Sequence, residues 1–167
     1  MTSATLTPIE LTAEAFAAFG DVIEVSGEPD RLINGGRCGR YHDLAKLDFH
    51  SSGQAGINLF RSQPVSLPLR IELVERHPLG SQCFIPLTGN EYLVVVGDDD
   101  NGEPRNLQAF LARSHQGVNY HRNVWHGVLM PIGSDATFAV VDWIGQDQNL
   151  EEFHFRDPIE ISAPGSG

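Results

Sequence analysis

Short apolar or alternating runs, separated by turns, dominate the chain after one early helical segment. Thr12 is the predicted N-cap of this helix, and Gly20 is its predicted end. The later runs have the length and alternation of β-strands. They cover residues 21–25, 57–61, 69–77, 82–87, 91–96, 107–112, 125–130, 137–143 and 152–155. Gly, Pro, Asn and Asp separate them, so the pattern predicts a mainly β fold, a mostly antiparallel barrel or sandwich with one or two short helices.

The length of the chain suits one domain. It has 167 residues, and domains cluster at roughly 100–150 residues. No repeat, long linker or low-complexity tract divides it. We therefore expect a single domain over residues 1–167, with a frayed tail at 163–167.

Charge and cysteine content narrow the possible partners and the compartment. Eleven Lys and Arg stand against 22 Asp and Glu, which gives a net charge of −11 and argues against binding to nucleic acid or to an anionic membrane. A small anionic substrate stays possible because a pocket can be locally positive. Cys38 and Cys83 cannot form a disulfide framework, and the apolar runs are too short to span a membrane. Met1–Ile9 lacks the features of a signal peptide, so we expect a cytoplasmic protein.

Polar side chains fall on an otherwise apolar strand face in the run 69–77. Residues two apart share a face of a strand, so Glu75 and His77 follow Leu69, Ile71 and Leu73 on one side. A buried carboxylate is costly unless it is paired, hydrogen-bonded, protonated or bound to a metal. The alternative is that the strand ends before Glu75 and both residues reach solvent.

Other strands repeat this arrangement. By the same alternation, His126 lies on the face of Val124 and Val128, Arg61 follows Leu59, and Asp142 follows the apolar positions 138 and 140. Each of these residues alone is also compatible with a structural role, either as a core histidine whose hydrogen bonds are satisfied or as a charged residue at a strand end. Together they indicate a barrel with one open, functional end.

The spacing of two motifs is similar to that of cupin barrels. Cupins carry His-x-His-(x)4-Glu-(x)6-Gly and Pro-x-Gly-x-x-His; here Glu75, His77, Gln82 and Gly89 keep the first spacing, and His121–His126 keeps the second. Glu75 replaces the first His and Gln82 replaces the Glu. No His-Glu-x-x-His, Gly-x-Ser-x-Gly or phosphate-binding loop is present. The candidate metal ligands are Glu75, His77, Gln82 and His126.

A longer resemblance covers the chain from about Leu11 to Trp143. The strings that carry it are Ala17-x-x-Gly-Asp-Val-Ile23, Arg40-Tyr-His-Asp-Leu44, Arg61-x-Gln-Pro64, Glu75-Arg-His-Pro-Leu-Gly80, Phe84-Ile-Pro86 and Gln116-Gly-Val-Asn-Tyr-His-Arg-Asn-Val-Trp-His126. They resemble the ureidoglycolate lyase family, also called ureidoglycolate hydrolase. The resemblance implies a cupin-like β-barrel, a homodimer, and cleavage of ureidoglycolate to glyoxylate and urea in cytoplasmic purine (allantoin) catabolism. It also implies a divalent metal, nickel, with a zinc-type ion as the alternative, and no organic cofactor.

The residues supply each part of this chemistry. Ureidoglycolate is a carbinolamide, so its cleavage needs a base for the hydroxyl proton and an acid for the departing urea. Arg61 is the predicted partner of the carboxylate, and His121 or Glu75 is the predicted base. The remaining candidates are Asp142 as a catalytic residue and Tyr92, Asn119 and Tyr120 as substrate-binding residues.

Three other functions stay open. One is hydrolase-type release of ammonia from the same substrate, which the sequence does not separate from lyase chemistry. Another is a different metal-dependent cupin enzyme, such as an oxygenase or isomerase, for which a stronger ligand set is expected. The third is a non-catalytic cupin that binds a small organic acid.

Overall fold

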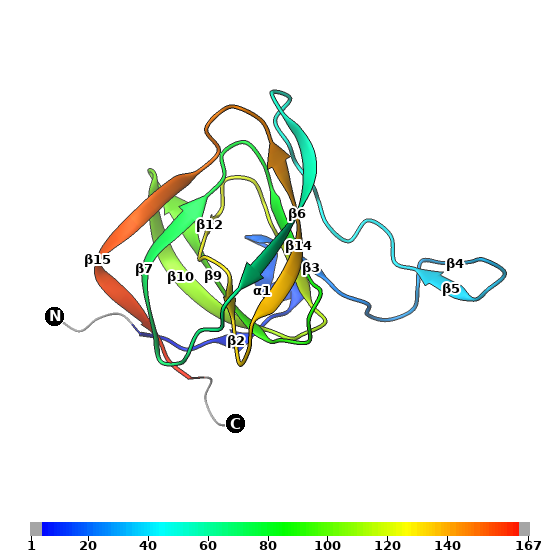
Figure 1. Ribbon diagram of the computed structural model, residues 1–167, viewed down its shortest axis with the longest axis horizontal. Helices are drawn as coiled ribbons and strands as arrows, with labels where there is room; N and C mark the ends of the chain where they lie inside the picture. The colour runs from blue at the N-terminus through cyan, green and yellow to red at the C-terminus, as the bar shows by residue number, and fades with distance from the viewer. Residues whose placement is uncertain (1–4, 164–167) are drawn as a thin grey trace.

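The computed structural model describes residues 5–163, and β-strands make up most of it (Figure 1). Its elements are β1 (Thr5–Leu6), β2 (Ile9–Glu10), α1 (Ala13–Phe16), β3 (Gly20–Ile23), β4 (Arg31–Ile33), β5 (Cys38–Arg40), β6 (Gln54–Ser62), β7 (Leu69–Arg76), β8 (Gln82–Pro86), β9 (Tyr92–Asp100), β10 (Glu103–Ala112), β11 (Gly117–Tyr120), β12 (Trp125–His126), β13 (Met130–Pro131), β14 (Ala136–Ile144) and β15 (Glu151–Ile161). The expected frayed tail extends into residues 164–167, which lie outside the described residues. Within residues 5–163, no helix is long and apolar enough to cross a membrane.

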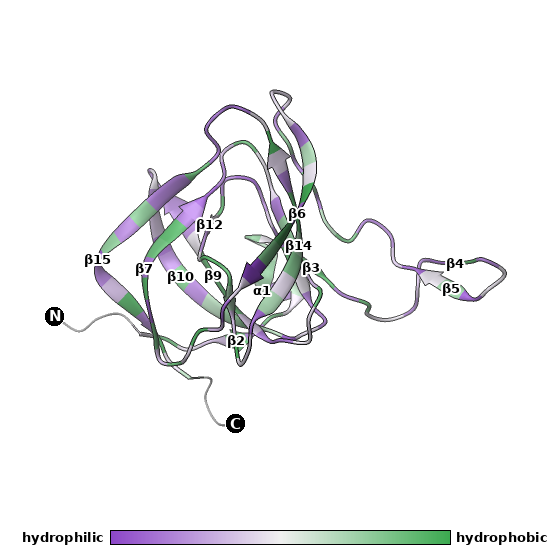
Figure 2. Ribbon diagram, viewed as in Figure 1, coloured by the Kyte–Doolittle hydropathy of each residue, from purple (hydrophilic) through white to green (hydrophobic). Residues whose placement is uncertain are grey.

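Two curled sheets face each other and enclose the core (Figure 1). One sheet has the order β1-β15-β7-β12-β9-β10-β2, with β13 also paired to β9, and the other has the order β3-β11-β8-β14-β6. Pairing is antiparallel except where β1 meets β15 and β2 meets β10. Polar and apolar residues alternate in bands along β15 (Figure 2), as expected for strands with one covered face. The predicted mainly β, mostly antiparallel barrel is confirmed.

Aromatic side chains fill the space between the sheets. Phe16, Phe110 and Phe138 are fully buried. The ring of Phe138 packs edge-on against Tyr92, with their centroids 5.0 Å apart, and Phe16 packs edge-on against Phe110 at 5.7 Å. Such edge-to-face pairs add to the stabilisation from burial itself, and they fix the inner faces of both sheets.

The predicted early helix is a single turn. The side-chain oxygen of Thr12 accepts a hydrogen bond from the Ala15 backbone N–H at 3.1 Å, so the predicted N-cap is confirmed. The helix ends at Phe16, earlier than the predicted end at Gly20, which instead begins β3. A Cβ at Gly20 would lie 1.9 Å from the carbonyl oxygen of Asn119, so this glycine is required by close strand pairing.

Each predicted strand run overlaps an observed strand, and five observed strands were missed. The missed strands are β1, β2, β4, β5 and β11. They have two to four residues each, which is too short for alternation to be recognised. The predicted run 125–130 is divided into β12 and β13 around Gly127–Leu129, a segment that lines a cavity.

The five-stranded sheet has two different faces. Leu59 on β6 pairs with Ala139 on β14, which pairs with Ile85 on β8, so these three residues share one face. This outer face carries exposed apolar side chains: Ile57, Leu59, Ile85 and Leu87. Their chain neighbours Phe60, Phe84 and Phe138 point into the barrel, where their rings are in contact.

Candidate active site

Glu75, His77 and His126 come together at one end of the barrel interior. Glu75 lies near the end of β7, where it pairs directly with His126 on β12, and His77 follows β7. One ligand atom from each of the three side chains lies within 4.8 Å of the others. The strand β7 extends to Arg76, so the alternative that it ends before Glu75 is wrong.

Both histidines present a free nitrogen lone pair to this cluster. The Nδ1 atom of His77 lies 2.7 Å from the carbonyl oxygen of Asn149, and Nδ1 of His126 lies 3.0 Å from that of Gly127. A carbonyl only accepts hydrogen bonds, so each Nδ1 carries the proton in the neutral ring and each Nε2 keeps its lone pair. Both Nε2 atoms are buried and have no hydrogen-bond partner among residues 5–163.

The three groups shift one another's protonation. Burial alone raises the pKa of Glu75, but His77 and His126 beside it outweigh this and lower the pKa below its ordinary value. Burial alone lowers the pKa of His77, but the Glu75 carboxylate and the Asn149 carbonyl raise it. Burial, together with neighbouring His77, lowers the pKa of His126 to about 4. Glu75 is thus ionised and His126 neutral near pH 7.

A hydrogen-bonded set of amides and a carboxylate lies next to this cluster. Asp142 on β14 accepts hydrogen bonds from Asn58 Nδ2 at 2.9 Å and from Gln82 Nε2 at 3.4 Å. Its negative charge is close enough to contribute to the raised pKa of His77. Gln82 is buried, and no described residue forms a hydrogen bond with its Oε1 atom. Asp142 therefore fixes the Gln82 amide with its oxygen free.

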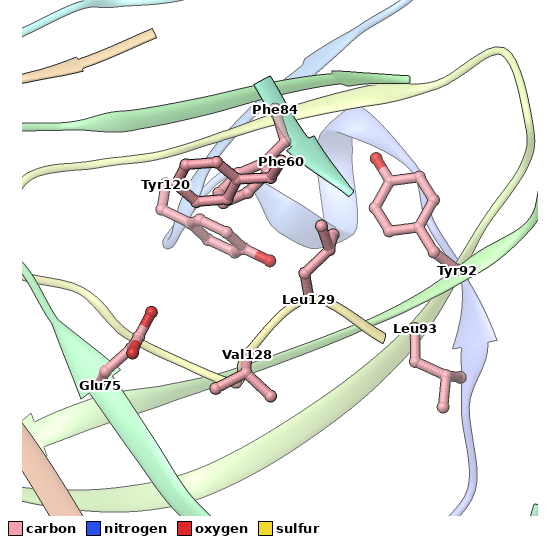
Figure 3. Close-up of a pocket in the computed structure, with 9 residues that line it drawn as sticks. Phe60, Glu75, Phe84, Tyr92, Leu93, Tyr120, Val128 and Leu129 are labelled. Atoms are coloured by element: carbon pink, nitrogen blue, oxygen red, sulfur yellow. The ribbon is translucent and has the colours of Figure 1, made fainter. Parts of the chain in front are cut away.

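A cavity of about 220 Å³ opens beside the cluster. Its walls are mostly apolar, and the residues that line it are Phe60, Glu75, Phe84, Tyr92, Leu93, Tyr120, Gly127, Val128 and Leu129. Figure 3 shows the Glu75 carboxylate and the Tyr120 hydroxyl directed toward the same space. An apolar pocket with a few convergent polar groups is the usual form of a small-molecule site.

Tyr120 connects the cavity to the histidines. Its ring stacks on His126 at 4.1 Å between centroids and 6° between planes, which fixes the orientation of the imidazole. Burial raises the pKa of Tyr120 above its ordinary value. Its hydroxyl therefore stays protonated and can donate a hydrogen bond to a ligand in the cavity.

The prediction that Arg61 points into the pocket is wrong. Arg61 does share a face with Ile57 and Leu59, but this is the outer face of the sheet. Its side chain is 75% exposed, and its Nη2 atom lies 3.3 Å from the carboxylate of Asp135. The alternation of β6 groups these residues correctly, but it does not identify the inner face, because Ile57 and Leu59 are apolar and exposed.

His121 and Asn119 also lie away from the cluster. Both contact Asp21 on the neighbouring strand β3: His121 Nε2 lies 3.1 Å from Asp21 Oδ2, and Asn119 Nδ2 donates to the same oxygen at 2.9 Å. Tyr92 lines the cavity with its ring, while its hydroxyl donates to the Gln116 carbonyl at 2.7 Å. The structure thus brings together Glu75, His77, Gln82, Tyr92, Tyr120, His126 and Asp142, and leaves Arg61, Asn119 and His121 outside.

Sequence reasoning missed several residues of the site. Asn58 holds Asp142, and it could have been found because it shares the alternation of Phe60 on β6. Leu129 and Val128 line the cavity from the loop after β12, where no periodicity marks them. Asn149 orients His77 through its backbone carbonyl, a contact that leaves no signal in residue type.

The donor set fits a divalent metal ion. Two imidazole nitrogens with free lone pairs and a carboxylate converge, and the other nitrogen of each ring is held by a carbonyl, as is usual for metal-binding histidines. Mixed nitrogen and oxygen ligands suit first-row ions such as nickel or zinc. The Gln82 oxygen is a further neutral candidate ligand.

Two solved structures resemble this fold at low sequence identity. One is a dTDP sugar isomerase from Desulfovibrio desulfuricans G20, with 16% identity, a TM-score of 0.49, and coverage of 83% of this chain and 84% of that chain. The other is RmlC from Streptococcus suis in complex with dTDP-D-xylose, with 14% identity, a TM-score of 0.43, and coverage of 56% and 46%.

Sequence comparisons identify the family. The ureidoglycolate lyase family model matches residues 3–162. A ureidoglycolate lyase from Rhodobacter capsulatus is 58% identical over 92% of this chain and 95% of its own length. One from Brucella anthropi is 51% identical over 92% and 94%, and one from Rhizobium etli is 51% identical over 93% and 95%. This chain therefore belongs to the ureidoglycolate lyase family.

Proposed function

We propose that this protein is a ureidoglycolate lyase, which cleaves ureidoglycolate to glyoxylate and urea. The observation that carries this proposal is the cavity beside Glu75, His77 and His126, in a chain 58% identical to a protein named for this activity. The small volume, the apolar walls and the few polar groups at one end suit a substrate of this size.

Glu75 is the proposed proton carrier. Its carboxylate is ionised, half-buried and directed into the cavity (Figure 3). It takes the proton of the substrate hydroxyl while the carbinol C–N bond breaks and the C=O bond of glyoxylate forms. The same carboxyl group then gives that proton to the nitrogen of the departing urea, so the step is balanced without a further reactant.

Tyr120 and Gln82 are the proposed orienting groups. The Tyr120 hydroxyl donates a hydrogen bond into the cavity, and the unpartnered Gln82 oxygen accepts one from an N–H group. Asp142 keeps Gln82 in this orientation. The aromatic and aliphatic walls exclude water, which strengthens these electrostatic interactions. The exclusion of water also favours elimination of urea over hydrolysis of the substrate's ureido group.

The proposed metal ligands are Glu75, His77, Gln82 and His126. A nickel or zinc-type ion bound there would supply a positive charge that polarises the hydroxyl and carboxylate oxygens of the substrate. A carboxylate has two oxygens, so Glu75 can serve as a ligand with one and accept the substrate proton with the other.

Product analysis tests the proposed reaction. Purified protein is incubated with racemic ureidoglycolate, and glyoxylate, urea and ammonia are assayed together. A lyase releases equal amounts of glyoxylate and urea and no ammonia, with one enantiomer consumed if the site is chiral. Release of ammonia in step with glyoxylate would replace this proposal by the hydrolase activity, and no product would reject both.

We also propose that the protein is a cytoplasmic homodimer. Exposed apolar residues on the outer face of the five-stranded sheet, such as Leu59 at 69% and Ile57 at 77% exposure, favour contact with a second copy. Both cysteines are free thiols, which suits a reducing compartment. Light scattering should give twice 18.3 kDa, and Leu59→Glu should shift the protein toward monomer. A wild-type monomer at micromolar concentration would contradict the dimer.

A further inference from the structure

A long connection between β3 and β6 projects away from the barrel (Figure 1). This arm, residues 24–45, ends in a hairpin in which β4 and β5 pair with each other and with no other strand of the described chain. A two-stranded hairpin is only marginally stable in water when nothing packs against it. Leu32 on this hairpin is 60% exposed and Val25 at the arm's base is 72% exposed, so the arm presents apolar side chains with no cover from its own barrel.

The hairpin at residues 31–40 carries three arginines and no acidic residue, although the chain as a whole is acidic. Arg31, Arg37 and Arg40 are exposed, and within residues 5–163 none of them forms an ion pair. Arg31 and Arg40 lie directly opposite each other on the two strands. Like charges in this position destabilise a strand pair, and a shared anion would reverse that effect.

The active-site cavity lacks the arginine side chains that the hairpin carries. No residue that lines it is Lys or Arg, and Arg61 is turned outward onto Asp135. The arginines nearest to the cluster in sequence are used elsewhere: Arg76 binds Asp99 and Glu151, and Arg122 donates to the Pro78 carbonyl. A carboxylate substrate in this cavity therefore finds no guanidinium from its own barrel.

We propose that each arm reaches a second copy of the chain, where Arg31 and Arg40 lie at the mouth of the active-site cavity and bind the substrate carboxylate. Two guanidinium groups around one carboxylate give short, charge-assisted hydrogen bonds and remove the repulsion between the arginines. This inference rests on the proposed function, which supplies the anionic substrate.

The arm is held away from its own cavity. Tyr41 donates to the Gly27 carbonyl, and the Asp30 carboxylate accepts from the His42 backbone N–H at 2.8 Å, which closes the base of the hairpin. Asp21 accepts from the Lys46 backbone N–H at 2.9 Å, which ties the returning chain to β3. The arm joins the two edge strands of the sheet whose outer face is apolar. A second copy seated on that face lies beside the arm, and two-fold symmetry makes the exchange reciprocal.

A mixed dimer tests whether the arm acts on the other copy. The arm variant Arg31→Gln/Arg40→Gln should lower kcat/KM by at least about tenfold, mainly through KM, and the site variant Glu75→Gln should be nearly inactive. A heterodimer of the two, purified with two different tags, pairs an intact site with an intact arm from the other copy. It should recover about half of the wild-type activity, since one of its two sites is complete.

The heterodimer experiment also defines the results that would overturn the proposal. If an arm serves its own cavity, both sites of the heterodimer are defective. A heterodimer that recovers no activity would therefore overturn the proposal. Unchanged activity of the arm variant alone also overturns it. The matched control is Arg70→Gln/Arg156→Gln, which removes two exposed arginines that form no ion pair with any described residue and should keep kcat/KM within about twofold. Inactivity of the wild-type protein toward ureidoglycolate would instead reject the proposed function.

Cross-linking tests the position of the arm without any activity. Cys38 on β5 is exposed, whereas Cys83 is buried and burial raises its pKa to about 11, so a benzophenone maleimide attaches at Cys38. Light and ¹⁵N-labelled chains are mixed and irradiated, and the cross-linked peptides are identified by mass. Light-to-heavy links to peptides around Phe60 or Val128–Leu129 support the proposal. Links confined to one chain, or to surfaces remote from the cavity, overturn it.

Discussion

The inner and outer faces of the five-stranded sheet consist of alternating residues of the same strands, yet they have different roles. On the inner face, Phe138 is fully buried and Asp142 holds Gln82 beside the cavity. On the outer face, Arg61 is in solvent with Asp135, and His121 contacts Asp21. Residues of similar chemistry therefore serve the proposed site or the surface according to their position in the two-residue repeat.

The difference shows what alternation can and cannot tell. It assigns residues to two faces, but only packing decides which face is inside. Asp142 follows buried Phe138 and Val140, whereas Arg61 follows Ile57 and Leu59, which are apolar and exposed. An apolar face that is covered only in an assembly looks like a core face in sequence. Variants in matched positions on the two faces test this division.

The largest expected effect is a loss of stability from the inner face. Phe138→Ala removes a fully buried ring that packs against Tyr92 and Phe84, and we expect the free energy of unfolding to fall by about 3–5 kcal/mol. Its chain neighbour Thr137 points to the other face, so Thr137→Ala should cost less than about 1 kcal/mol. Chemical denaturation measures both. Equal losses would mean that the faces are not distinct in packing.

The second effect is on catalysis. Glu75→Gln keeps the shape of the side chain and removes the proton acceptor, so kcat should fall by about 100-fold or more. Arg61→Lys on the outer face keeps its charge toward Asp135, and we expect kcat/KM to stay within about twofold. Steady-state kinetics with ureidoglycolate compare them. A tenfold loss in Arg61→Lys would show that Arg61 contacts the substrate in the working enzyme.

The parts of the site that sequence predicted are ligand-type side chains at the spacing of a known motif. Glu75, His77 and His126 follow from alternation and from the cupin spacing, and the structure brings them together. Asn149 could not be predicted, because it acts through a backbone carbonyl in a loop. The sequence also does not predict that the arm projects from the barrel, because β4 and β5 differ from the other strands only in lying outside the two large sheets.

The third effect is on metal binding, which should depend on His126 and not on His121, five residues before it. His126 presents a free Nε2 to the cluster, whereas His121 contacts Asp21 on the outer side. Nickel at ten times its Kd should stabilise the wild type by about 1.4 kcal/mol. His126→Ala should lose this increment and His121→Ala should keep it. Thermal shift with and without nickel gives the increment independently of each variant's own stability, and a shift retained in His126→Ala would place the ion elsewhere.

The smallest effect is the pH dependence of the outer-face contact at Asp21. Burial alone raises the pKa of Asp21, but hydrogen bonds from Asn119 and the Lys46 backbone, together with His121, outweigh this and lower it below 3.8. A carboxyl group whose pKa is lower in the folded state stabilises the fold above its unfolded pKa, and this contribution disappears as the pH falls through the folded value. Asp21→Asn should therefore be less stable than the wild type near about pH 6, and the gap in the free energy of unfolding should narrow as the pH falls below 3.8. Urea denaturation across this range measures the gap, and a gap that stays constant with pH would show that Asp21 contributes through packing and not through its charge.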